Sequence, residues 1–438
     1  MRLMPEVLRG SRRPGLMQMV EYTFRPERFV RRNVARFGPL FRMKGPVGEI
    51  VLTALPEHAR KVFAADADTF GTLGTVSLSG ILGARSVLVT DGPVHRKQRK
   101  LLTPPLHGPR LRAFGEQMQA IALHHVTRLE PGQRLAAHEL TTEFTLDVIL
   151  RTVFGVQSAS EVGALRPVVL GMLAGFSPLV IFAPFLQHRY FPPYRQYLAS
   201  RARFDRAVDA LVAARRADGK PREDVLSLLL AARYDDGSPM DDDEIRDQLL
   251  TLLLAGHETT AITLAWVLDF VLRRPELLAR LEDEIAGVTD PDALAKLPLL
   301  GAVIDETMRI APIVTDVARI PKHAFELEPG CVVPKGTPLM VLIEGIHRDE
   351  SIYPDARSYR PERFLERRFS PTEFLPFGGG SRRCLGAAFS EHEGRIFLAT
   401  LLQHAKLRTI GRRPSRRVRR NITMGPADGV PVEVVSRR

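Results

Sequence analysis

The chain has 438 residues, of which 45% are hydrophobic and 26% are charged. This composition is typical of a globular protein with a large buried core, and it excludes a disordered or fibrous chain. The two cysteines, Cys331 and Cys384, exclude a disulfide framework and fit a reducing compartment, where a thiol is free to act as a ligand or a nucleophile.

The formal net charge is +12, and arginine supplies most of the basic side chains. Such a charge fits an electropositive face that steers an acidic electron-carrier protein, nucleic-acid binding, or solvated arginines on an ordinary surface. No basic cluster alternates with aromatic residues, and no nucleic-acid-binding motif is present. We therefore predict no nucleic-acid partner.

The first thirty residues contain arginines throughout and no continuous apolar run. They lack the features of a signal peptide or an N-terminal membrane span, so we predict a cytoplasmic protein. The longest uncharged stretch, residues 167–187, is interrupted by two glycines and two prolines. We interpret it as two short apolar segments that cover a lipophilic cavity, with contact to a membrane surface as the alternative. We expect no integral membrane segment.

Strand patterns occur near residues 40–53, and helical periodicity then dominates from about residue 110 to residue 311. Within that region, apolar residues recur at three- and four-residue spacing in residues 201–216 and 222–233. When apolar residues gather on one face of a helix in this way, that face packs against a shared core. The middle of the chain is therefore predicted to be helical.

The clearest helix begins at the acidic run of residues 240–244, where carboxylates can cap free N–H groups, and it stops before Pro275. Its apolar middle predicts burial on most sides. Strand patterns return near residues 323–342 and at residues 430–435, and the basic stretch of residues 412–420 is expected on a loop. The fold class predicted is mainly α with a smaller β portion, near the N-terminus and after residue 318.

Residues 374–386 form an unusual loop in which three consecutive glycines precede Cys384 and another glycine follows it. An amphipathic helix follows, so the cysteine lies at a helix N-terminus, where free N–H groups and the helix dipole favour a thiolate. Such a thiolate acts as a nucleophile or a metal ligand; the alternative is a small buried hydrophobic residue. Cys331 has no such setting and is predicted to be a plain turn or strand residue.

In the central helix, the hydroxyl of Thr259 can donate to the carbonyl of Ala255, four residues earlier, which bends a helix. Glu258 and Thr259 form an acid–alcohol pair suited to proton transfer. The alternative is an interior threonine beside an incidental acid. His257 points elsewhere on the helix and receives no catalytic role.

Four segments, in order and spacing, resemble the motifs of the cytochrome P-450 family. Residues 377–386 match the haem-binding loop F-G-x-G-x-R-x-C-x-G at every fixed position. Residues 255–260 match the A/G-G-x-D/E-T-T of the central helix, residues 306–309 match E-x-x-R, and residues 360–364 contain P-E-R-F. A single such motif is unspecific, but four in series identify the chain as similar to this family, with its fold as one haem domain over residues 1–438 and no fused reductase.

The resemblance implies that Cys384 is the thiolate ligand of the iron of haem b, and it gives cofactor-binding positions to Phe377, Gly386 and Ala255. An axial thiolate pushes electron density onto iron and favours cleavage of the O–O bond. Glu258 and Thr259 would deliver protons to oxygen bound there.

The resemblance also places cations at the two haem propionates, since buried carboxylates need cations. His95 and Arg99 lie four residues apart on one helix face and match the propionate-binding helix. Arg319 and Arg382 match the other propionate positions.

Glu306 and Arg309 lie three residues apart on one helix face. A buried Arg–carboxylate pair needs further partners to offset its desolvation. The family supplies a third member, which in this chain is Arg363. We interpret the three as a structural lock behind the cysteine loop and not as catalysts.

The implied reaction inserts one oxygen atom of O₂ into a lipophilic small molecule, with electrons from NAD(P)H delivered by a separate ferredoxin- or flavodoxin-type carrier. The cavity walls expected, residues 72–82, 168–186, 253–262 and 313–317, carry few charges, so the substrate class predicted is a fatty acid, terpenoid, steroid or polyketide. The alternatives are a haem-thiolate peroxygenase or rearrangement enzyme, and a non-catalytic haem-binding protein. The acid–alcohol pair argues against both.

Overall fold

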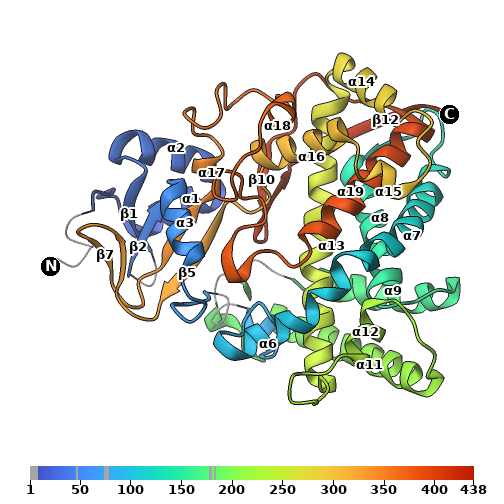
Figure 1. Ribbon diagram of the computed structural model, residues 1–438, viewed down its shortest axis with the longest axis horizontal. Coiled ribbons are helices and arrows are strands. Elements are labelled where there is room, and N and C mark those ends of the chain that lie inside the picture. Colours follow the sequence, from blue (N-terminus) through green and yellow to red (C-terminus); the bar gives the residue numbers. More distant parts are fainter. Residues whose placement is uncertain (1–7, 46–47, 74–77, 177–179, 182–183) are drawn as a thin grey trace.

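The structure is a computed structural model that describes residues 8–45, 48–73, 78–176, 180–181 and 184–438. The largest sheet lies at one end of the molecule, and the long helices fill the rest (Figure 1). The helices have the following bounds: α1 Gly15–Phe24, α2 Pro26–Phe37, α3 Pro56–Ala64, α5 Ser79–Leu82, α6 Gly92–Leu102, α7 Pro109–Val126, α8 Ala137–Thr152, α9 Ala159–Ala174, α11 Pro192–Asp218, α12 Val225–Ala231, α13 Asp242–Leu272, α14 Pro275–Ile285, α15 Pro291–Leu294, α16 Pro298–Ile310, α17 Ile343–Ile346, α18 Glu362–Glu366 and α19 Ala387–His404.

Helix α13 is the long central helix that the sequence predicts. Its N-cap is Asp241, whose carboxylate accepts a hydrogen bond from the backbone N–H of Glu244 at 2.9 Å. Three acidic residues in its first turn favour the positive end of the helix dipole. Among the described residues, α13 alone is long and apolar enough to span a membrane, but 67% of its apolar window is buried inside the protein, as expected of a core helix.

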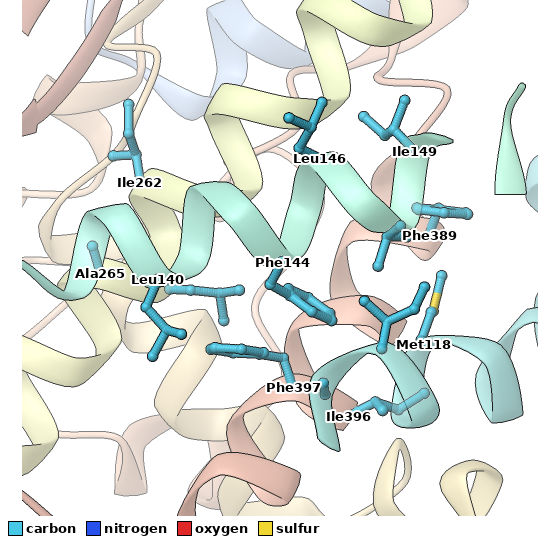
Figure 2. Close-up of a cluster of buried hydrophobic side chains, with 14 of the residues drawn as sticks. Met118, Leu140, Phe144, Leu146, Ile149, Ile262, Ala265, Phe389, Ile396 and Phe397 are labelled. Atoms are coloured by element: carbon cyan, nitrogen blue, oxygen red, sulfur yellow. The ribbon is translucent and has the colours of Figure 1, made fainter. Parts of the chain in front are cut away.

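The main core lies where α7, α8, α13 and α19 meet (Figure 2). The rings of Phe144 in α8 and Phe397 in α19 have centroids 4.3 Å apart, and Met118 of α7 packs beside them. Two threonines of α8 also bond to α13: Thr141 donates to the carbonyl of Ala261 at 2.9 Å, and Thr145 to that of His257 at 3.2 Å. These contacts hold α13 against α8 at the segment that carries its motif.

The strands form small sheets around the helices. The bounds are β1 Leu40–Gly45, β2 Gly48–Thr53, β3 Phe70–Gly71, β4 Arg134–Ala136, β5 Asp316–Pro321, β6 Phe325–Glu328, β7 Cys331–Val333, β8 Leu339–Leu342, β9 Ala405–Thr409, β10 Arg417–Arg420, β11 Thr423–Pro426 and β12 Pro431–Arg437. The largest sheet has the order β1-β2-β8-β5-β3, in which β2 and β8 are parallel and the other pairs antiparallel. It joins the N-terminal hairpin to strands from far along the chain.

Most predicted elements are confirmed, including the hairpin in residues 40–53, the strands in residues 323–342 and the C-terminal strand. Cys331 is a buried residue of β7, as predicted. The prediction of a loop for residues 412–420 is wrong at its end, because Arg417–Arg420 pairs with β11 as strand β10. This pairing depends on a second strand, and a run of arginines has no apolar alternation from which the strand could be predicted.

The apolar stretch of residues 167–187 also differs from expectation. Helix α9 continues through Gly171 to Ala174, so this glycine does not interrupt it, and Gly175 is its C-cap. The segments 177–179 and 182–183 lie outside the described residues, as do residues 74–77 of the expected cavity wall.

Candidate functional site

The cysteine loop owes its shape to glycine. Gly378 and Gly380 have φ values of 64° and 70°, in the left-handed region that favours glycine. A Cβ atom on Gly380 would lie 2.5 Å from the carbonyl oxygen of Phe63 in α3, so the loop packs directly on that helix. The N–H of Cys384 donates to the carbonyl of Phe377 at 3.0 Å, which closes the loop. The glycine run predicted to be special is therefore required by backbone geometry.

The sulfur of Cys384 lies two residues before Gly386, the N-cap of α19, and the Gly386 N–H donates to it. Burial nevertheless raises the pKa of this thiol, against a smaller opposing effect of that N–H and of Arg383 and Arg99. The expectation that the helix terminus alone would favour the thiolate is therefore wrong for the protein by itself. A metal cation deprotonates a thiol that coordinates it.

Two residues predicted to bind the cofactor are accessible. Cys384 is exposed, although protein packed around its sulfur raises the pKa of the thiol. Ala255, in the middle of the core helix α13, is also exposed, although most of that helix is buried. Both accessible residues are predicted to border the cofactor.

The four residues predicted to bind propionates lie near one another. His95 and Arg99 are on α6, Arg319 is on β5, and Arg382 precedes the cysteine. Burial, and then the guanidinium groups of Arg382, Arg99 and Arg319, lower the pKa of His95 to about 4. Burial likewise lowers the pKa of Arg319 to about 10 and that of Arg99 and Arg382 by a smaller amount. Each pKa is lowered because burial separates the charged form of the group from water.

The positive charge of this cluster is only partly neutralised. Asp91, which no sequence pattern singled out although it directly precedes α6, accepts hydrogen bonds from Arg382 and from the N–H of Thr72. Arg99 and Arg319 donate instead to backbone carbonyls, including that of Arg383 at 2.7 Å. Three guanidinium groups and one carboxylate leave two positive charges in this set of residues.

In α13, the bond predicted from the sequence is present: Thr259 Oγ1 donates to the carbonyl oxygen of Ala255 at 2.7 Å. The helix remains continuous here. Gly256 packs closely against α8, since a Cβ atom at this position would lie 3.3 Å from the side chain of Ile149. His257 is buried, which lowers its pKa to about 4, and it stays outside the site as expected.

The carboxyl group of Glu258 interacts with two residues that no sequence pattern predicted. Burial raises the pKa of its carboxyl group, and the charge of Arg420 and a hydrogen bond from Thr423 oppose that rise. The hydroxyl of Thr423 lies 3.5 Å from Glu258 Oε1. Both partners belong to the β10–β11 hairpin, which was expected to be partly loop. A raised pKa leaves Glu258 able to carry a proton.

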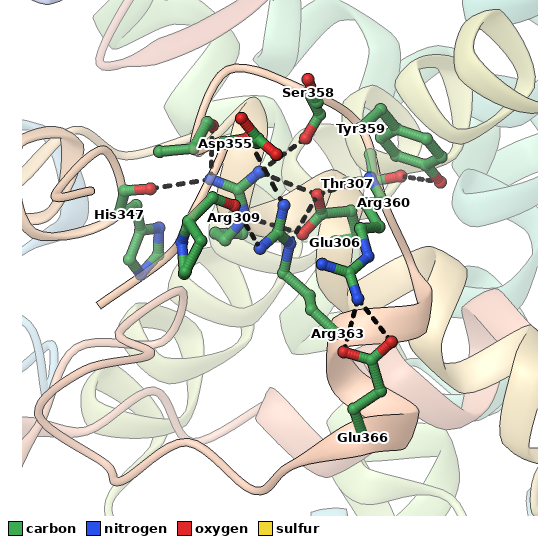
Figure 3. A network of polar contacts seen from close by, with 12 residues as sticks. Glu306, Thr307, Arg309, His347, Asp355, Ser358, Tyr359, Arg360, Arg363 and Glu366 are labelled. Carbon is green, nitrogen blue, oxygen red and sulfur yellow. Dashed lines mark hydrogen bonds and ion pairs between the residues drawn. The ribbon is translucent and has the colours of Figure 1, made fainter. Parts of the chain in front are cut away.

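The predicted structural lock is present (Figure 3). Glu306 and Arg309 are completely buried and joined at 2.6 Å and 2.8 Å, and Arg363 approaches Glu306 at 3.2 Å. The N–H of Arg360 also donates to Glu306 at 2.8 Å. The remaining donors of Arg309 reach the carbonyls of His347, Ala356 and Ser358. Every charge in this group thus has its partners inside the chain.

His347 connects this lock to the cysteine loop, and sequence reasoning missed it. Its carbonyl accepts from Arg309 at 2.8 Å, while its Nε2 accepts from the N–H of Leu375 at 2.9 Å. Burial lowers the pKa of His347 to about 3, so the ring is neutral and can accept that bond. Leu375 begins the stretch that leads to Cys384. The lock is therefore coupled to the loop through one imidazole.

A cavity of about 610 Å³ opens elsewhere, between α7, α9 and the loop before α12. Its lining includes Arg151, Glu161 and Arg222 but none of the predicted site residues. No group of three or more His, Cys, Asp or Glu side chains suited to a bare metal ion occurs in the described part of the chain.

This donor set fits haem. The accessible Cys384 can supply one sulfur ligand to an iron that a porphyrin holds by its other bonds. The two uncompensated positive charges match the two propionates of that group. The family model described as Cytochrome P450 matches residues 9–428.

The chain belongs to the cytochrome P450 family.

As a cytochrome P450, the protein is a haem-dependent monooxygenase whose cofactor is haem b, and O₂ and a redox partner are its general requirements. Similar members of the family occur in mycobacteria. Cytochrome P450 138 of Mycobacterium tuberculosis is 33% identical over 431 residues, which cover 97% of this chain and 95% of that protein. Cytochrome P450 137 of the same organism is 36% identical over 427 residues, covering 94% and 86%. Cytochrome P450 135B1 of Mycobacterium bovis is 34% identical over 439 residues, covering 98% and 91%.

The solved structure of retinoic acid bound cyanobacterial CYP120A1 superposes with a TM-score of 0.84, at 24% sequence identity and over 94% of both chains. This likeness confirms the predicted cytochrome P450 fold, mainly α with a smaller β portion.

Proposed function

We propose that this cytochrome P450 is a cytoplasmic monooxygenase that oxidises a lipophilic small molecule, a fatty acid, terpenoid, steroid or polyketide, with electrons from NAD(P)H through a separate ferredoxin- or flavodoxin-type carrier. The observation that carries the proposal is the pairing of an accessible Cys384 with a buried, positively charged cluster. Both serve one cofactor, so residues 1–438 act as a single haem unit in this proposal.

In this proposal Cys384 is the sulfur ligand of the iron, with Phe377 and Gly386 shaping its loop and Ala255 bordering the haem on the side of α13. His95, Arg99, Arg319 and Arg382 would hold the propionates, by charge or by hydrogen bonding. Haem, when bound, supplies the activation of O₂ that lets one oxygen atom enter the substrate while the other leaves as water. All other steps fall to the side chains of this chain.

Glu258 and Thr259 are proposed as the proton-delivering pair. Burial raises the pKa of the Glu258 carboxyl group, which favours its protonated form and suits it to donate a proton. The Thr259 hydroxyl has its own hydrogen committed to the Ala255 carbonyl, which leaves its oxygen free to accept a hydrogen bond on the other side. The Thr259 oxygen can thus position a proton-carrying group by accepting its hydrogen bond, while the proton itself comes from the Glu258 carboxyl group.

The ligand assignment is tested by Cys384→Ala, with Cys331→Ala as the matched control because Cys331 is buried in β7. The Cys384→Ala protein should lose the long-wavelength Soret band of its reduced carbon monoxide complex, and the control should keep it. Retention of that band in Cys384→Ala would end the proposal. A Soret titration of the wild-type protein with lipophilic compounds then identifies substrates, and turnover with reductase and O₂, compared with hydrogen peroxide, separates a monooxygenase from a peroxygenase.

The proton-delivery assignment is tested by Thr259→Ala, with Thr263→Ala as the control. Both hydroxyls donate to the carbonyl four residues earlier, so the two changes cost α13 a similar bond. Thr259→Ala should release most electrons as hydrogen peroxide, a drop in coupling of about tenfold or more, as expected for loss of a positioned proton donor. Normal coupling in Thr259→Ala, measured as product formed per NAD(P)H consumed, would contradict the role.

A further inference from the structure

Helix α1, Gly15–Phe24, carries an exposed apolar ridge. Leu16, Met17, Val20 and Phe24 are 77%, 57%, 49% and 65% exposed, although each is a large apolar side chain. At about 100° of rotation per residue, the four occupy about 100° of the helix circumference. Single exposed apolar residues are common on protein surfaces, but four on one helix face mark a contact surface. These four residues are called the α1 ridge.

The opposite face of α1 is fastened to the protein by polar contacts. Gln18 and Tyr22 are its buried residues. The amide of Gln18 donates to the carbonyls of Ser11 and Arg13, at 3.2 Å and 2.8 Å, and the Tyr22 hydroxyl donates to the buried carboxylate of Asp316 in β5. These bonds fix the rotation of the helix. The fold therefore holds the α1 ridge outward, toward whatever lies beyond the surface (α1 stands at the sheet end in Figure 1).

Arginines surround the ridge. Arg12 and Arg13 precede α1, Arg25 and Arg28 follow it, and all four side chains are exposed. Arg13 pairs with Glu21 at 3.6 Å, and Glu21 also pairs with Arg32 at 2.5 Å. Within the described part of the chain, Arg12, Arg25 and Arg28 form no ion pair, so both ends of the ridge carry positive charge.

We infer that the α1 ridge docks this protein on the surface of an anionic phospholipid bilayer. Apolar side chains of an interfacial helix enter the boundary between headgroups and acyl chains, and flanking arginines meet the phosphates. Helix α1 is already folded and anchored, so binding does not have to form it. A ridge of about 15 Å on one helix is far smaller than a stable protein–protein interface, which favours the bilayer over a protein partner.

Binding of this kind would depend neither on the compound oxidised nor on the redox partner, and it would hold the protein at the membrane surface through α1.

The test is co-sedimentation of the haem-loaded protein with vesicles of phosphatidylcholine alone and of phosphatidylcholine mixed with phosphatidylglycerol. The wild-type protein should bind the anionic vesicles and bind less as salt is added. Leu16→Ser combined with Phe24→Ser should raise the lipid concentration needed for half-maximal binding about tenfold or more. Arg12→Gln combined with Arg13→Gln should have a similar effect.

Two controls match these changes. Leu88→Ser with Leu365→Ser removes two exposed apolar side chains elsewhere, and Arg412→Gln with Arg413→Gln removes two exposed arginines elsewhere. Both controls should bind like the wild type, and all variants should keep the haem absorbance. Failure of the wild type to bind, or an equal loss in either control, would overturn the inference. A dimer without lipid that the ridge variant dissociates would assign the ridge to a second copy and overturn it as well.

Discussion

Glu306, Arg309 and Arg363 are buried, whereas in the cluster of His95, Arg99, Arg319 and Arg382 only His95 and Arg319 are buried and the other two are half-buried. The two groups of charges also differ in their ion pairs. In the first group, both guanidinium groups bond directly to the carboxylate of Glu306. In the second, Arg382 bonds to the carboxylate of Asp91, while Arg99 and Arg319 bond to backbone carbonyls. A buried charge whose partners all lie in the chain has a structural role, whereas a buried charge without such partners indicates a ligand-binding site.

Of the changes that test this difference, Arg309→Ala should have the largest effect, a loss of unfolding free energy. The change leaves Glu306, which is 0% exposed, without its main partner, and an uncompensated buried charge costs about 3–5 kcal/mol. Thermal or denaturant unfolding of both the haem-loaded and the haem-free protein should show the loss. The control is Arg360→Ala, whose guanidinium pairs with Glu366 at the surface and which should cost under about 1 kcal/mol. Equal effects of the two changes would remove the distinction drawn above.

Arg319→Met should have an intermediate effect, and its sign should differ between the haem-free and the haem-loaded protein. This arginine is buried beside Arg382 and bonds only to carbonyls, so its removal should leave the haem-free protein equally stable or slightly more stable. The haem-loaded protein should lose a charge-assisted bond to a propionate, which weakens haem retention by about 10- to 100-fold. Haem transfer to apomyoglobin measures retention, and unfolding of the apoprotein measures stability. Destabilisation of the apoprotein as large as that of Arg309→Ala would place Arg319 in the first group.

The smallest effect is expected at Asp305, the neighbour of Glu306 in α16. Burial and the nearby Glu391 raise the pKa of Asp305 to about 7, since no cation bonds to it directly. A carboxyl group whose pKa is raised by folding contributes most stability below its unfolded-state pKa, and this contribution is lost as the pH rises from about 4 to about 7. Asp305→Asn should therefore match the wild type at about pH 4 and exceed its unfolding free energy by a margin that grows up to about pH 7 and then stays constant. The exposed Asp235→Asn should show no such pH-dependent gain.

Sequence reasoning found the helices and strands whose periodicity and caps were local, such as α13 with Asp241 at its start. It missed what depends on distant pairing. The strand β10 forms only because residues 423–426 lie beside it, and a run of arginines has no strand pattern of its own. The partners of Glu258 and the connection through His347 were missed for the same reason, because each joins residues more than twenty positions apart.

The candidate site shows the same division. The residue types at the motif positions indicated the haem family before any coordinates, and the Thr259–Ala255 bond followed from helical spacing alone. The pKa of Cys384 did not follow, since the local helix terminus suggested a lowered value whereas burial among the surrounding elements raises it. Desolvation is a sum over everything packed around a group, and a local pattern does not contain that sum.

By itself, the sequence determined the family, the haem, the order of the elements and the identity of the residues that carry charge, because these reside in local patterns and in motif spacing. Only the tertiary structure decided which of those charges find partners, that Asp91 bonds to one of the predicted propionate-binding arginines, and that the apolar face of α1 is held outward. The reason is that neutralisation and burial are properties of groups brought together from distant parts of the chain, and they exist only once the chain has folded.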